Sequence, residues 1–127
     1  MIHLTLNPEH GILLESSDDI NIDNCSASLN GKNRIYFDTV NNINITIVIA
    51  KNNNFEDSIY FEIALTNFDN VTLTSCQSYD DREPSLQAYG LKLSGTNAGI
   101  SLLNCKLSLN KNGEIYNPNA EKITVIT

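Results

Sequence analysis

The chain of 127 residues has no tryptophan, one methionine and three prolines. It also lacks an uninterrupted apolar run of about 20 residues, which excludes a membrane-spanning helix. Residues 1–10 have neither a basic start nor a continuous apolar stretch, so the sequence predicts no secretory signal and we expect a cytoplasmic protein. With 41% hydrophobic and 18% charged residues, the composition is that of one globular domain, which we expect to span residues 1–127.

Basic residues are scarce as well. Eight lysines and arginines against 15 acidic residues give a formal charge of −7, which argues against a nucleic-acid surface and favours a basic protein partner. Phosphate-binding loops, zinc motifs and dinucleotide fingerprints are absent from the sequence. The two histidines, His3 and His10, lie together near the start, away from most serines and cysteines. We therefore expect no cofactor, no metal and no catalytic residue.

Asparagine is abundant instead, at about one residue in seven, and short runs of Ile, Leu and Val alternate with polar residues. This alternation is typical of strands. The segment from Gly11 to Cys25 recurs from Gly90 to Cys105. Similar segments between and after them give a period of roughly 23 to 24 residues, which predicts a stacked repeat. The period is lengthened once, at residues 79–88.

Each repeat contains three apolar pairs, with side chains at i and i+2 on one face of a strand. The first-strand pairs are Ile12/Leu14, Ile35/Phe37, Ile59/Phe61 and Leu91/Leu93, followed by Ile115 alone. The second-strand pairs are Ile20/Ile22, Ile43/Ile45, Val71/Leu73, Ile100/Leu102 and Ile123/Val125. The third-strand pairs are Cys25/Ala27, Val48/Ala50, Cys76/Ser78 and Cys105/Leu107, with Ile2 and Leu4 as one further member.

This pattern resembles the right-handed parallel β-helix, the pectate-lyase-like solenoid family, over nearly the whole chain. The resemblance implies an all-β fold of about five rungs, with three short strands in each rung. An antiparallel β-sandwich is the alternative. The family often has a left-handed asparagine between the second and third strands, where Asn24 and Asn104 stand. Ile47 and Ser75 depart from that pattern, and a β-branched isoleucine disfavours the bend.

Cys25, Cys76 and Cys105 occupy one inward column together with Val48. We interpret them as small core residues, since neither metal-ligand spacing nor an even number for disulfides is present. Cys76 and Cys105 would lie about one strand spacing apart, which allows an adventitious bond between them.

Candidate binding residues lie on the outer face of the first sheet. The pattern predicts one outward column of Leu13, Tyr36, Tyr60, Lys92 and Tyr116, and a second of Glu15, Asp38, Glu62 and Ser94. Tyrosines beside acids suit a sugar or a protein. Asp38 and Glu62 would stand roughly 5 Å apart, near the carboxylate separation of retaining glycosidases. The family's catalytic motifs are not matched, and outward charges also simply keep a sheet soluble.

The insertion at residues 79–88 is the second candidate surface, through Asp80, Asp81, Arg82 and Glu83. Neither end of the chain carries a polar cap or a helix, so the ends would be covered by more of a longer solenoid, by a partner or by a second copy. The leading hypothesis is a non-enzymatic acidic solenoid, such as an inhibitor or immunity-type protein that masks a basic protein. The alternative is a module that binds or cleaves carbohydrate through Tyr36, Tyr60, Asp38 and Glu62.

Overall fold

The computed structural model describes residues 2–5, 11–28, 35–52, 63–96, 99–120 and 122–127, which form ten strands and no helix. The strands are β1 (Ile2–Thr5), β2 (Ile12–Asp18), β3 (Asn21–Ser28), β4 (Ile35–Lys51), β5 (Ile63–Thr74), β6 (Gln77–Tyr79), β7 (Tyr89–Ser94), β8 (Ile100–Leu103), β9 (Gly113–Tyr116) and β10 (Val125–Ile126).

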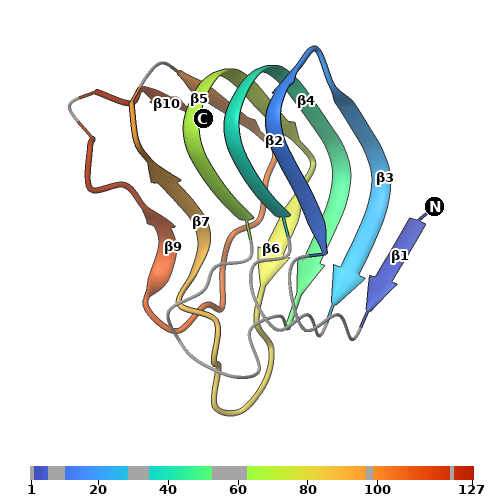
Figure 1. The fold of residues 1–127 in the computed structure, drawn as a ribbon. Coiled ribbons are helices and arrows are strands. Elements are labelled where there is room, and N and C mark those ends of the chain that lie inside the picture. Colours follow the sequence, from blue (N-terminus) through green and yellow to red (C-terminus); the bar gives the residue numbers. More distant parts are fainter. Residues whose placement is uncertain (1, 6–10, 29–34, 53–62, 97–98, 121) are drawn as a thin grey trace.

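All of the strand pairs in the described part of the chain are parallel. Ile12 pairs with Ile35, Ile35 with Ile63, Ile63 with Leu91 and Leu91 with Ile115. The same strand therefore returns once per rung and stacks on its predecessor, as Figure 1 shows for β2, β4, β5, β7 and β9. The antiparallel sandwich is excluded because sequential strands of this kind would have to run in opposite directions.

The two longest strands each cover more than one side of a rung. β4 pairs with β2 near its start, with β3 along its second half and with β6 at its end. The strand bends between these regions and curves around the coil in Figure 1. These three regions are the three strand positions of one rung, which we call the first, second and third strand. The prediction of three strands per rung is therefore confirmed.

The core consists of inward columns that run from rung to rung. Its fully buried members share an aliphatic or phenyl side chain and a position facing the coil axis: Ile35, Phe37, Val40, Ile43, Ile45, Val48, Ile63, Leu65, Phe68, Leu73, Leu91, Leu93 and Ile100. Burying one such side chain contributes about 1.5 to 3 kcal/mol. Single rungs bury little by themselves, so this term arises from stacking.

Two parts of the predicted register are wrong. Ile35 and Phe37 pair with Ile63 and Leu65, whereas the prediction placed Ile59 and Phe61 there. Residues 53–62 lie outside the described part of the chain. The repeat is consequently lengthened twice, first between Lys51 and Ile63 and again at the predicted insertion.

The second error lies at the end of the chain. Ile100 pairs with Val125, although the prediction paired it with Ile123. Both errors shift the strand by an even number of residues, so the same alternate side chains still face inward.

The bend between the second and third strands has the same backbone conformation in four rungs. Asn24, Ile47, Ser75 and Asn104 have φ angles of 54°, 51°, 52° and 54°. The expectation that Ile47 disfavours the bend is therefore wrong for this rung. The same bend recurs in the rungs on either side, at Asn24 and Ser75, and the Ile47 side chain stays 49% exposed.

The cysteine column is confirmed. Cys25 pairs with Val48, and the pairs that follow, Ile49 with Gln77 and Gln77 with Lys106, place Val48, Cys76 and Cys105 in line. All three cysteines are free thiols. Cys76 is fully buried and Cys25 is 7% exposed, which fits the interpretation as core residues.

Candidate functional site

The outer face of the first sheet carries most of the predicted column. Tyr36 lies beside Leu13 in β2 and Ala64 in β5, while Lys92 lies beside Ala64 and Tyr116. Ala64 therefore takes the place predicted for Tyr60, which lies outside the described residues. Tyr116 is 39% exposed, and its ring centroid lies 5.3 Å from that of Tyr89, so one end of this face is aromatic.

The predicted carboxylate pair does not form at the expected register. Asp38 lies beside Glu15 in β2 and Thr66 in β5, and Thr66 lies beside Ser94. Glu62 lies outside the described residues, and Thr66 occupies its predicted place. Thr66 and Ser94 hydroxyls are hydrogen-bonded at 2.9 Å, so this column turns from acidic to hydroxylic along the coil.

A second acidic surface lies at the corner where the first strand turns into the second. We call it the acidic ridge and define it by the exposed or half-exposed side chains of three successive rungs: Glu15, Asp18, Asp19, Asp38, Asn41, Asn42, Asp69 and Asn70. The corner segments 15–20, 38–43 and 66–71 contain no lysine or arginine. The ridge therefore combines five carboxylates with amides and carries no positive side chain of its own.

Hydrogen bonds between rungs fix these side chains in place. The Asn41 amide donates to Asp18 at 2.8 Å and the Asn42 amide donates to Asp19 at 3.0 Å. The Asn70 amide continues the second ladder by donating to Asn42 at 2.7 Å. These amide donors are uncharged, so they fix the positions of the carboxylates without neutralising their negative charge.

The sequence explains why asparagine and aspartate stand at this corner. Asp19, Asn42 and Asn70 have φ angles of 58°, 53° and 52°, in the left-handed region that these residues tolerate better than other side chains. The backbone of the corner therefore favours Asx residues, and the same side chains build the ladder. The strand-based prediction missed Asp18, Asp19 and Asp69, although Asp18-Asp19 aligns with Asn41-Asn42 at the spacing of one repeat.

The inserted loop is organised around one buried carboxylate. Asp80, 1% exposed, pairs with the Arg82 guanidinium at 2.7 Å and accepts hydrogen bonds from the backbone N–H groups of Leu86 and Gln87, both at 2.7 Å. Burial by itself raises the pKa of Asp80, but the Arg82 guanidinium and the N–H groups outweigh it and hold the pKa below its usual value. Asp80 is therefore a structural residue and not the contact residue that we predicted.

The other predicted loop residues are better placed to contact a partner. Asp81 and Glu83 are exposed, and with Arg82 they line a cavity of about 550 Å³ between the loop and residues 109–111. Asp81 forms an ion pair with Lys51 at 2.9 Å and accepts the Asn52 amide at 2.7 Å. Hydrogen bonds from Lys51 and Asn52 lower the pKa of Asp81, and the same pair raises the pKa of Lys51.

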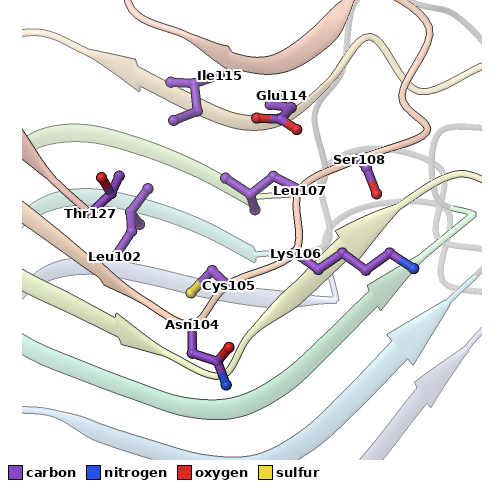
Figure 2. A pocket seen from close by; sticks show the side chains of 9 residues that line it. All are labelled: Leu102, Asn104, Cys105, Lys106, Leu107, Ser108, Glu114, Ile115 and Thr127. Atoms are coloured by element: carbon purple, nitrogen blue, oxygen red, sulfur yellow. The ribbon is translucent and has the colours of Figure 1, made fainter.

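A further cavity, of about 410 Å³, lies beside the last described rung. Leu102, Cys105, Leu107 and Ile115 are among its lining residues, and Figure 2 shows Lys106 pointing away from the side on which Leu102 and Cys105 lie. Within the described residues, three or more His, Cys, Asp or Glu side chains nowhere gather closely enough to hold a metal ion. The side chain of His3 and the whole of His10 lie outside the description.

Comparison with known proteins decides the family. The family model described as "Right handed beta helix region" matches residues 2–126. The chain belongs to the right-handed β-helix family. The match covers all ten strands, and it agrees with the parallel register of the five first strands, so the predicted fold is confirmed.

Neither the curated proteins nor the solved structures contain a match to this β-helix protein. In the described part of the chain, no helix is long and apolar enough to cross a membrane.

Proposed function

We propose that this β-helix protein is a non-enzymatic interaction protein that binds a basic protein partner through the acidic ridge, in the manner of an inhibitor or immunity-type protein. The observation that supports the proposal most is the charge segregation at the corner. Five carboxylates project there from three stacked rungs, and the three corner segments contain no lysine or arginine. Such a surface attracts lysine and arginine side chains and speeds encounter with a basic protein.

The ladder makes this surface suitable for tight binding. The carboxylates of Asp18 and Asp19 are already held by Asn41 and Asn42. Binding therefore has less side-chain entropy to remove than it would at a mobile acidic loop. The inserted loop adds a second region with two exposed carboxylates, of which Asp81 is paired with Lys51 and Glu83 lies on the other side of Arg82.

A charge-matched pair of variants tests the proposal. Asp18→Asn with Asp69→Asn removes two ridge charges, and the amide oxygen introduced at the first position can still accept the Asn41 hydrogen bond. Asp23→Asn with Glu114→Gln removes two exposed charges outside the ridge and the inserted loop. Proteins captured from a lysate of the source cells are identified, and the affinity of each purified partner is then measured at about 50 and 200 mM salt.

We expect a basic partner whose affinity falls about tenfold or more in the ridge variant, changes little in the control and weakens as salt rises. Equal affinity of both variants for every captured partner would refute the ridge as the binding surface.

A second candidate function, carbohydrate binding, rests on the aromatic end of the first sheet. The Tyr89 and Tyr116 rings pack at 5.3 Å with an interplanar angle of 41°, and aromatic faces cover the C–H surface of sugar rings. Binding on a glycan array that is lost in Tyr116→Ala, while Tyr79→Ala retains it, would favour this function over the ridge.

A further inference from the structure

Two cysteines of the inward column lie side by side in neighbouring rungs. Lys106 donates its backbone N–H to the Cys76 carbonyl at 2.9 Å, and Ser78 donates to the Lys106 carbonyl at 2.7 Å. Because this parallel pairing sets Gln77 against Lys106, the preceding residues Cys76 and Cys105 are in register. Adjacent strands lie about 4.8 Å apart, within the Cα separation of about 4.4 to 6.8 Å that a disulfide needs.

The two thiols differ in their access to solvent. Cys76 is fully buried. Cys105 is partly exposed and lines the cavity of about 410 Å³ beside the last described rung (Figure 2). A small molecule that enters this cavity therefore meets Cys105 first, and Cys76 lies directly behind it.

We propose that Cys76 and Cys105 are an oxidation site, at which a hydroperoxide reacts with Cys105 and the product closes to a Cys76–Cys105 disulfide. In the reduced form the Cys105 Sγ lies 3.3 Å from the Leu73 carbonyl oxygen, and the Cys76 Sγ lies 3.5 Å from that of Ile45. Both sulfurs thus lean toward the preceding rung in the same way, and each has a weak contact that it can give up.

Electrostatics assign the first step to Cys105. The neighbouring Cys76 thiol lowers the pKa of Cys105, which favours the thiolate, the nucleophilic form, at Cys105 rather than at Cys76. The same neighbouring thiolate, together with burial, raises the pKa of Cys76 and keeps it protonated. Oxidation removes the negative charge of Cys105. The main cause of the raised pKa of Cys76 is then gone, so Cys76 loses its proton more easily.

The chemistry balances with one equivalent of hydroperoxide. The Cys105 thiolate attacks the O–O bond, a sulfur–oxygen bond forms, and the leaving alkoxide takes a proton to become an alcohol. Cys76 then loses its proton and attacks the Cys105 sulfur, which forms the S–S bond and expels hydroxide as water. Two thiols are oxidised and one O–O bond is reduced.

Cys25 provides an internal control. It occupies the same column but stacks on Val48, so it has no thiol in the adjacent described rung. Val48 also shows that valine fits this column, which makes Cys76→Val and Cys105→Val the appropriate variants. Thermal unfolding of each variant establishes that it is folded before its thiols are examined.

The experiment treats the reduced protein with hydrogen peroxide and maps the products by peptide mass spectrometry without reduction. We expect the linked Cys76–Cys105 peptide, an intact Cys25 thiol, and oxidation of Cys105 about tenfold faster than Cys25 at pH 7. In Cys76→Val, Cys105 should stop at the sulfenic acid, which dimedone traps. In Cys105→Val, Cys76 should stay a thiol.

Absence of the linked peptide in the wild-type protein would overturn the proposal. So would Cys105 and Cys25 oxidising at equal rates, or disulfides that join Cys25 instead.

Discussion

Ile47 holds a backbone conformation that β-branched residues rarely adopt. Its φ of 51° matches the bends at Asn24 and Asn104, and a left-handed conformation costs an L-residue about 1 to 2 kcal/mol. We predict that Ile47→Asn stabilises the protein by about 1 kcal/mol, which raises Tm by about 3 to 5 °C. Calorimetric unfolding measures this shift.

Ile49 is the matched control for this substitution. It lies two residues further along β4, half-buried, with no left-handed φ. Ile49→Asn relieves no backbone strain and should lower Tm. A lower Tm for Ile47→Asn as well would show that the isoleucine side chain contributes more to stability than the bend costs.

At the scale of single elements, the inserted loop depends on Asp80. Its folded pKa is below the unfolded value, so the carboxylate stabilises the fold at pH values above the unfolded pKa of about 3.9. This contribution is lost as pH falls through the folded pKa. We predict that Asp80→Asn costs about 2 kcal/mol at pH 7 and flattens the decline of Tm between about pH 5 and pH 3.

Asp81 is the control in the same loop, because it is exposed and its ion pair with Lys51 lies in solvent. Asp81→Asn should change Tm less at pH 7 and leave the acid decline nearly as in the wild-type protein. If the two variants behave alike, Asp80 does not organise the loop.

Strand elements were predictable to different degrees along the chain. Alternation identified which face of each strand points inward, because a register shift by one residue would turn the apolar side chains of the core toward solvent. It did not distinguish Ile59/Phe61 from Ile63/Leu65 as partners of Ile35/Phe37, because a shift by four residues keeps the same face inward. Only the pairing of stacked strands settles such an even shift.

The candidate site was harder to predict from the sequence for two physical reasons. Asp80 looked like a surface residue because its sequence neighbours are charged, but the loop folds back and buries it among N–H donors. The ridge lies at a corner, where strand alternation carries no information. Glu15 and Asp38 were recognised because they also belong to the first strand.

At the scale of the whole molecule, stability is carried by columns that pass through several rungs. Ile45 is fully buried between Ile22 and Leu73. We predict that the Ile45→Asp variant is unfolded at room temperature and shows no cooperative thermal transition, because an unpaired charge would enter the column. Circular dichroism during heating measures the loss.

Asn44→Asp is the control, since Asn44 precedes Ile45 but is exposed. It should retain a cooperative transition. An unchanged Tm for Ile45→Asp would mean that the register of this column is wrong.

The rungs differ in length at one place above all. The interval between the paired first-strand residues Ile12 and Ile35 is shorter than the interval from Ile35 to Ile63, and the interval from Ile63 to Leu91 equals the longer one. In both longer rungs most of the added residues fall between a third strand and the next first strand, and the columns stay aligned. The chain can therefore be lengthened at this corner without a change in the packing of the core. Peptides inserted beside Glu83 should leave the register of the stacked strands unchanged. Evolution and protein engineering can both use such a position to add a recognition segment without redesigning the coil.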